Sequence, residues 1–177
     1  GPNNPSQHTL KTLIQNEPYY FIDNITYDNN HNLWVSNNGV NTMLSAIENG
    51  NVSDPDAWKG FPIGDKIGTG TSLIDVVVSD NNHIWGVLKS SIHEIGGLVA
   101  YNYNNTLHNI EDDELKKFQI RNQDGSQITD IVTAIAKDKN GHMWVGTGEG
   151  VYVYYNPDNV FQDNEPFYAS RVLVPLK

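Results

Sequence analysis

Cysteine is absent from the 177-residue sequence, which excludes a disulfide framework, a thiolate nucleophile and a zinc site built on thiolates. Basic residues are few: 11 Lys and Arg stand against 21 Asp and Glu, and the formal net charge is -10. Such a chain lacks the basic face that nucleic acids or anionic lipid surfaces require. No apolar run approaches the roughly 18 residues of a membrane-spanning helix, so direct membrane insertion is not expected.

Asparagine, by contrast, is abundant, with 23 residues. Its side chain caps turns and it tolerates left-handed backbone, so asparagine pairs favour turns between short strands. Such pairs occur at 29–30, 37–38, 81–82 and 104–105. No long amphipathic helix is evident, and residues 110–118 suit a loop at least as well as a short helix. The opening Gly1-Pro2 matches what a tag-removing protease leaves behind and is set aside.

A repeated unit is the strongest pattern. In each of three copies, aliphatic residues stand six and three positions before an Asp, and a Trp follows five or six positions after it. The pairs are Asp28 and Trp34, Asp80 and Trp85, and Asp138 and Trp144. The unit has the physics of a β-hairpin, in which the Asp caps the turn by accepting backbone N–H bonds. The Trp then enters on the returning strand and gives one sheet face a large apolar surface.

Short strands repeating at intervals of roughly 50–60 residues predict an all-β fold made of β-propeller blades. We expect about three four-stranded antiparallel blades, at 21–71, 72–129 and 130–177, the last including the start of a further blade. Third strands are expected at 98–101 and 151–155, and outer strands near 58–61, 116–120 and 171–174. Residues 3–20 are interpreted as a linker or, at 9–14, as a strand of a preceding blade.

Three blades are too few for a closed propeller, which usually has about four or more. The pattern therefore favours a part of a larger propeller over a homo-oligomer that completes a ring. Open strand edges invite edge-to-edge pairing. We therefore expect the 177-residue chain to self-associate through these edges, or to be less stable than a parent protein with a closed ring.

Histidines and tyrosines are interpreted as parts of the fold. His31, His83 and His142 lie in the three turns, which point apart, so we expect them to be solvated and not to share a metal ion. Tyrosines 101, 103, 152 and 154 recur with a period of two, as on one face of a strand. Packing between blades is the favoured interpretation, and a platform that stacks on sugar rings is the alternative.

Two acidic segments resemble calcium ligands only superficially. Residues 28–32 begin like a calcium loop, but Leu33 stands where that loop needs Gly and Gly39 where it needs Glu. Residues 111–114 are interpreted as a solvated charge run. The sequence thus predicts no enzyme and no cofactor, with no catalytic, cofactor-binding or metal-binding residue, and leaves the ligand-binding residues unknown.

The third copy resembles a known repeat. Residues 135–147, followed by 150–154, are similar to the two-component regulator propeller repeat, which reads aliphatic-x-x-Asp-x-x-Gly-x-aliphatic-Trp-aliphatic-Gly-Thr and then Gly-aliphatic-x-x-Tyr. The first two copies depart from it, because Ser36-Asn37 and Val87-Leu88 replace the Gly-Thr pair. The resemblance implies propeller blades.

Residues 74–175 also resemble PorZ-type proteins, surface components of the Bacteroidetes type IX secretion system, most clearly at 96–101, 110–113, 151–161 and 169–172. This resemblance implies an exported, non-catalytic binding or assembly module at the cell surface or outer membrane. Its ligands would be protein partners of a secretion complex or lipopolysaccharide. The broader repeat implies the alternative, a periplasmic oligosaccharide-sensing domain of a hybrid two-component regulator. A propeller lyase or hydrolase is a third hypothesis.

Overall fold

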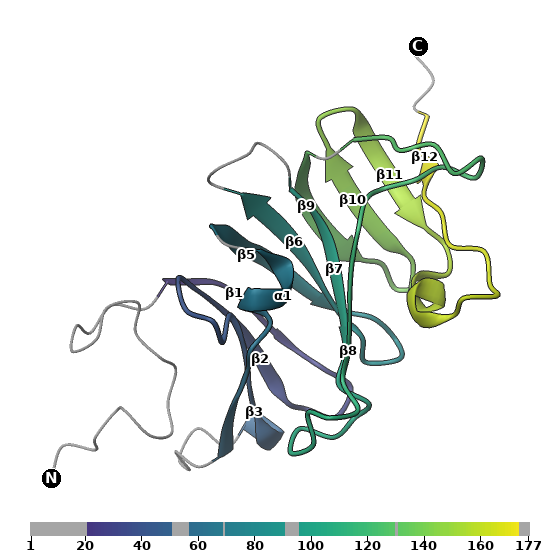
Figure 1. Cartoon of the computed structure of the whole chain (residues 1–177). Helices are drawn as coiled ribbons and strands as arrows, with labels where there is room; N and C mark the ends of the chain where they lie inside the picture. Colours follow the sequence, from purple (N-terminus) through teal and green to yellow (C-terminus); the bar gives the residue numbers. More distant parts are fainter. Residues whose placement is uncertain (1–20, 51–56, 69, 91–95, 130, 174–177) are drawn as a thin grey trace, which may run out of the picture.

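The computed structural model describes residues 21–50, 57–68, 70–90, 96–129 and 131–173. Gly1-Pro2, the segment 3–20 and the strand expected at 9–14 lie outside the described residues. Within the described part of the chain, three separate four-stranded antiparallel sheets follow one another (Figure 1). The prediction of an all-β chain with three four-stranded units is therefore confirmed.

Each sheet is a simple meander in which consecutive strands are neighbours. Sheet 1 contains β1 (Phe21–Tyr27), β2 (Leu33–Asn38), β3 (Leu44–Ile47) and β4 (Trp58–Phe61). Sheet 2 contains β5 (Thr71–Val78), β6 (Ile84–Ser90), β7 (Gly97–Asn102) and β8 (Glu114–Phe118). Sheet 3 contains β9 (Val132–Lys137), β10 (Met143–Thr147), β11 (Gly150–Tyr154) and β12 (Ser170–Arg171).

Among the described residues, the helical segments are short connections that the sequence did not indicate. These are η1 (Glu48–Gly50), α1 (Gly64–Ile67) and η3 (Pro157–Phe161). The segment left open between loop and helix at 110–118 ends in strand β8.

The first strand of every sheet contains a β-bulge at the same place. The pairing register shifts around Asp23 in β1, Ile74 in β5 and Thr133 in β9. A bulge bends its strand and increases the local twist. Repetition at equivalent positions shows that the three sheets share one design, although their sequences differ.

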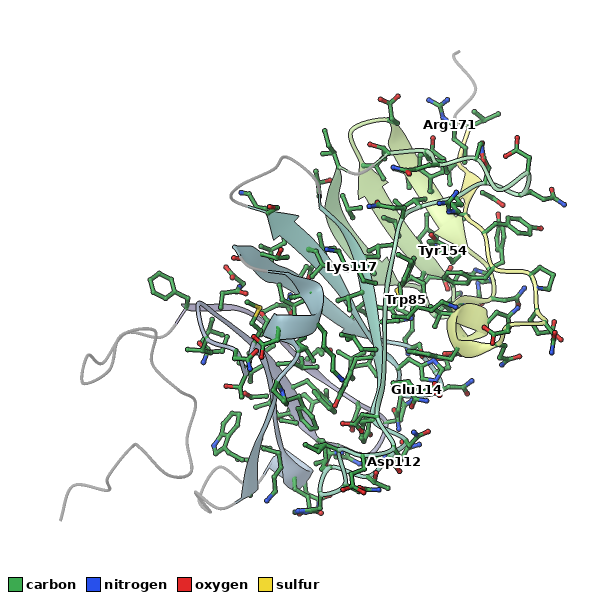
Figure 2. All side chains as sticks on the ribbon, in the orientation of Figure 1. Trp85, Asp112, Glu114, Lys117, Tyr154 and Arg171 are labelled. Carbon is green, nitrogen blue, oxygen red and sulfur yellow. The ribbon has the colours of Figure 1, made fainter. Side chains whose placement is uncertain are left out.

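The apolar core lies between the sheets. One cluster joins sheets 1 and 2 and includes Trp34, Phe61 and Tyr101, with the rings of Trp34 and Phe61 stacked at 5.0 Å. A second cluster joins sheets 2 and 3, where the rings of Trp85 and Tyr154 meet edge to face at 5.3 Å. Figure 2 shows Trp85 and Tyr154 in the space between these sheets. Neighbouring sheets therefore bury their facing apolar surfaces against each other.

The three hairpin turns also share one backbone conformation. The fourth residue of each turn lies in the left-handed region: His31 (φ 65°), Asn82 (φ 63°) and Gly141 (φ 83°). These residues stand three positions after Asp28, Ser79 and Asp138. Gly adopts this region without cost, and Asn and His are the residues next most often found there.

The second turn therefore begins one residue earlier than the repeat predicted. Ser79, not Asp80, is equivalent to Asp28, since its N–H bonds to the carbonyl of His83 at 2.9 Å. Trp85 then follows the turn start by six positions, as in the other two copies. The prediction that Asp80 begins and caps the second turn was wrong. Asp80 directly follows Ser79, and its residue type matches the Asp of the other two copies.

A shift of one residue exchanges the two faces of a strand. The aliphatic residues aligned in the second copy were Ile74 and Val77, which are only partly buried and lie against sheet 3. The structural equivalents, Leu73 and Val76, are buried against sheet 1.

The turn predicted at Asn37-Asn38 is also wrong, since both residues end strand β2 and are buried. The side chain of Asn38 donates to the carbonyl of Leu73 at 3.0 Å and accepts from its N–H at 2.7 Å. This amide thus pairs with the backbone of β5 and links sheets 1 and 2. The other three asparagine pairs lie in turns, as predicted.

Candidate functional site

The first turn converges on one buried carboxylate. Asp28 accepts backbone N–H bonds from Asn30 and Asn32 at 2.9 Å each, and a further bond from the Asn32 amide. The indole Nε1 of Trp34 and the hydroxyl of Tyr103 donate to it at 2.8 and 2.7 Å. Because Tyr103 follows β7, this carboxylate joins sheet 1 to sheet 2.

The second turn receives its carboxylate from another sheet. The buried Ser79 hydroxyl donates to Asp158 Oδ1 at 2.5 Å, and His83 Nδ1 lies 3.1 Å from the same oxygen. Asp158 lies on η3, in the connection between β11 and β12 of sheet 3. The two junctions therefore exchange roles. In the first junction the turn residue Asp28 provides the carboxylate, and Tyr103 of the neighbouring sheet provides the hydroxyl. In the second junction the turn residue Ser79 provides the hydroxyl, and Asp158 provides the carboxylate.

Ser79, His83 and Asp158 are the residue types of a hydrolase triad, but their geometry is different. The hydroxyl and the imidazole both face one carboxylate oxygen, so the imidazole is not placed to accept the serine proton. Burial raises the pKa of the Asp158 carboxyl, but the contacts with His83 and Ser79 outweigh it and hold that pKa below its ordinary value. The cluster is a junction that favours an ionised carboxylate.

The third turn is closed by its own donors. Asp138 accepts from the Trp144 indole at 2.9 Å and from the backbone N–H groups of Asn140 and His142 at 2.8 and 3.0 Å. The Trp144 bond is the main reason that the pKa of Asp138 falls to about 2, with the two backbone bonds adding to it against the opposing effect of desolvation. His142 Nδ1 lies 3.0 Å from the second carboxylate oxygen.

Hydrogen bonds and an ion pair link each turn to the next one along the chain. The Asn29 N–H donates to Asn82 Oδ1 at 2.8 Å, and the Asn29 side chain donates to the Asp80 carbonyl at 2.9 Å. Lys137 pairs with the Asp80 carboxylate at 2.7 Å. We call this connected surface the turn row, which consists of residues 28–32, 79–83 and 138–142.

A polar cavity of about 460 Å³ opens beside the turn row, at the junction of sheets 1 and 2. On its rim, His108 Nε2 lies 3.4 Å from Glu48 Oε2, and both side chains are exposed. Five of the lining residues are asparagines, whose amides both donate and accept hydrogen bonds. The lining consists of Asn30, Asn32, Glu48, Asn49, Asn105, Thr106, Leu107, His108 and Asn109.

The inner wall of this cavity is held by its own hydrogen bonds. Asn30 donates to Tyr103 at 3.1 Å and to Asn105 at 2.9 Å, and Asn82 donates to Asn105 at 2.7 Å. Burial, and then the bond to Asp28, raise the pKa of the Tyr103 hydroxyl well above its ordinary value. The hydroxyl therefore stays protonated at neutral pH and donates to Asp28 behind the cavity lining.

The six predicted repeat residues have different roles. Asp28 and Trp34, like Asp138 and Trp144, are bonded pairs. Trp85 is buried in the core, and Asp80 is exposed. Sequence reasoning missed Tyr103 and Asp158 as turn partners, because they stand 75 and 79 residues from their contacts.

The expectation of three solvated turn histidines needs correction, whereas the favoured interpretation of the tyrosines is supported. His83 is buried and His142 is partly buried, so only His31 is an exposed turn histidine. The four tyrosines at 101, 103, 152 and 154 are all buried between sheets, which supports packing and contradicts a sugar-stacking platform.

Among the described residues, no group of three or more His, Asp or Glu is placed to hold a metal ion. The helices found there are all too short and polar to span a membrane.

Comparisons with known proteins show which repeat and which fold the three sheets resemble. Residues 126–149 match the model of the "Two component regulator propeller" repeat. This confirms the resemblance predicted for the copy that contains Trp144. A search of curated proteins finds no match.

Among solved structures, the chain is similar to PorZ, described as "an essential bacterial surface component of the type-IX secretion system of human oral-microbiomic Porphyromonas gingivalis". The TM-score is 0.72 at 23% sequence identity, over 85% of this chain and 20% of the PorZ chain. The chain thus corresponds to a small part of that protein. The likeness shows that its three sheets have the fold of β-propeller blades.

Proposed function

We propose that the chain is a non-catalytic β-propeller module that binds or assembles partners in a cell-surface protein, within the type IX secretion attachment machinery. The similarity to PorZ over 85% of the chain carries this proposal. The turn row and its partner on η3 support it, because Asp28, Asp138 and Asp158 are each engaged with several donors that hold turns or sheets in place. These carboxylates serve structure and leave the neighbouring surface to recognition.

Fractionation of the native host tests the assembly function. The protein is affinity-purified from cross-linked cells, and its co-purifying peptides are identified from each membrane fraction. We expect recovery in the outer-membrane fraction together with components of a secretion assembly. Recovery in the inner membrane, with peptides of a histidine kinase on the same polypeptide, would sink this proposal and favour the sensor.

The polar cavity supports a second candidate, recognition of a saccharide. Its amides match the paired donor and acceptor character of sugar hydroxyls, and Leu107 offers a small apolar surface. Its lining contains no Lys or Arg, and its Glu48 and His108 side chains face each other, so it suits a neutral sugar better than a phosphate. An oligosaccharide, or the neutral sugars of lipopolysaccharide, would fit this chemistry.

Calorimetric titration with lipid-free oligosaccharide and with lipopolysaccharide tests the cavity. We expect Glu48→Gln or His108→Ala to weaken binding by about tenfold, since each removes or weakens one hydrogen bond at the rim of the cavity. The control Glu165→Gln makes the same charge change at an exposed position in the loop between η3 and β12. Equal affinity of all variants would place recognition elsewhere.

A further inference from the structure

The inner wall of the polar cavity has a fixed hydrogen-bond polarity. A carboxylate only accepts, so the Tyr103 hydroxyl must use its proton in the 2.7 Å bond to Asp28. The amide that reaches the Tyr103 oxygen at 3.1 Å must then be a donor, which identifies the contacting atom as Nδ2 of Asn30. The same atom donates to Asn105 at 2.9 Å. Asn30 Oδ1 is left without a hydrogen-bond partner among the described residues.

A second set of bonds fixes the amide of Asn105. The backbone N–H of Asn29 can only donate, so the atom of Asn82 that it meets at 2.8 Å is Oδ1. The other end of this amide, Nδ2, donates to Asn105 at 2.7 Å. Asn105 therefore receives donors from Asn82 and Asn30, and it must present Oδ1 to both. Its Nδ2 donates to no described residue and is available to a ligand.

The cavity thus offers one acceptor and one donor whose roles cannot be exchanged, Asn30 Oδ1 and Asn105 Nδ2. They come from different sheets, since Asn30 lies in the turn after β1 and Asn105 in the loop after β7. Leu107 is the apolar member of the lining, which contains no Lys or Arg. An uncharged group with an N–H, a carbonyl and a methyl has matching chemistry.

The second junction shows that an open polar wall is not a general property of these turns. His83 is the equivalent of the lining residue Asn32, because each stands four positions after the start of its turn. His83 Nδ1 lies 3.1 Å from Asp158, and its ring packs edge to face on Phe161 with centroids 4.8 Å apart. Both partners lie on η3. This segment covers the second turn at the place where the first turn opens to the cavity.

Building on the saccharide candidate, we propose that the cavity recognises the acetamido group of an N-acetylated sugar. Asn105 Nδ2 donates to the acetamido carbonyl, and Asn30 Oδ1 accepts from its N–H. A hydroxyl rotates to donate or to accept, so a wall of fixed polarity gives no selectivity for it. An amide N–H only donates and its carbonyl only accepts, so this group is bound well only where the wall has the complementary groups.

Asn105→Asp isolates the proposed donor. It keeps Oδ1 as the acceptor for Asn30 and Asn82 and replaces only the free Nδ2 by an oxygen, so both bonds within the wall remain. The probes are N,N′-diacetylchitobiose and cellobiose, which share one skeleton and differ in carrying acetamido groups or hydroxyls. In NMR titrations we expect wild type to bind diacetylchitobiose about tenfold more tightly than cellobiose, because the acetamido group makes two matched hydrogen bonds. Asn105→Asp should lose this preference.

A control and a second measurement separate this result from a change in charge or in folding. Asn122→Asp makes the same charge change at an exposed turn between β8 and β9 and should keep the preference. The side-chain N–H signals of Asn105 in wild type should shift with diacetylchitobiose, a readout that depends on no variant.

The acetamido assignment and saccharide recognition can fail separately. Equal affinity of wild type for the two disaccharides, or an Asn105→Asp protein that keeps the preference, would overturn the assignment and leave saccharide recognition standing. If neither disaccharide binds, the assignment also fails, and the calorimetric titration with oligosaccharide and lipopolysaccharide decides independently whether the cavity binds saccharides.

Discussion

Trp34 donates its indole N–H to the carboxylate of Asp28 across 2.8 Å, six residues back along the chain. Trp144 and Asp138 repeat this bond at 2.9 Å. At the second turn Ser79 replaces the aspartate, and the buried Trp85 Nε1 finds no acceptor within the described part of the chain. Three tryptophans at equivalent positions therefore differ in one hydrogen bond.

This difference predicts unequal costs for the same substitution. Trp34→Phe and Trp85→Phe both remove ring area from a fully buried site, but only Trp34→Phe also removes a hydrogen bond to a buried carboxylate. Such bonds contribute about 1.5–3 kcal/mol. We expect Trp34→Phe to lower the free energy of unfolding in urea by about 1–2 kcal/mol more than Trp85→Phe does. Equal or reversed costs would show that the indole bond adds little.

The bond between Ser79 and Asp158 predicts coupling between sheets 2 and 3. Asp158→Ala leaves the buried Ser79 hydroxyl and His83 without their carboxylate, at a cost of about 1–3 kcal/mol. Ser79→Ala should then cost less in the Asp158→Ala background than in wild type. A double-mutant cycle measured by urea unfolding should give a coupling energy of about 1 kcal/mol.

Asp163 is exposed and lies just after η3, so Asp163→Ala is the matched control for Asp158→Ala. It should show no coupling to Ser79→Ala within about 0.3–0.5 kcal/mol, the usual limit of additivity for independent sites. Additive behaviour of the Ser79 and Asp158 variants would mean that the short contact contributes nothing to the junction.

Local chemistry explains why the hairpins could be predicted. A capping Asp, a turn and a Trp act over six residues, so the pairs Asp28–Trp34 and Asp138–Trp144 are readable in the sequence. The second turn could not be located to one residue, since Ser79 and Asp80 are adjacent and either can cap a turn. Only the backbone, with its left-handed residue at Asn82, decides between them.

The junctions and the cavity could not be predicted, because their partners are distant in sequence. Tyr103 reaches Asp28 from another sheet, and Asp158 reaches Ser79 in the same way. The rim pair Glu48 and His108 is separated by 60 residues. Periodicity reports which residues face a core, but it carries no information on which loop lies beside which.

Asp138 predicts a dependence of stability on acid. Its pKa of about 2 in the folded protein lies below the unfolded value of about 3.9. Folding thus favours the ionised form, and this contribution is complete above about pH 4 and is lost as the pH falls to about 2. The difference in unfolding free energy between wild type and Asp138→Asn should therefore shrink from pH 5 to pH 2.

Trp144→Phe is the control for this titration, because it removes the hydrogen bond that lowers the pKa of Asp138 and leaves the carboxyl in place. In the Trp144→Phe background, the difference in unfolding free energy caused by Asp138→Asn should change less over the same pH range. An equal change in the two backgrounds would show that the Trp144 bond does not lower the pKa of this carboxyl.

Two glycines in central strands predict opposite effects of the same substitution. A Cβ on Gly86 would overlap Cδ1 of the buried Leu73 and lie 3.1 Å from Cγ1 of Val99. A Cβ on Gly146 would meet Ala134 Cβ at 3.5 Å, an ordinary contact. Overpacking a buried site costs about 1–3 kcal/mol. Replacing a compatible glycine by alanine instead stabilises by about 0.4–1 kcal/mol, since the unfolded chain loses freedom.

Gly86→Ala should therefore lower the urea midpoint and Gly146→Ala should leave it unchanged or raise it. Leu73→Ala in the Gly86→Ala background tests the cause, because it removes the overlapping atom. The combined loss should then be smaller than the sum of the two single losses, by about 1 kcal/mol. Strictly additive losses would mean that the close approach of β5 and β6 at Gly86 is not limited by Leu73.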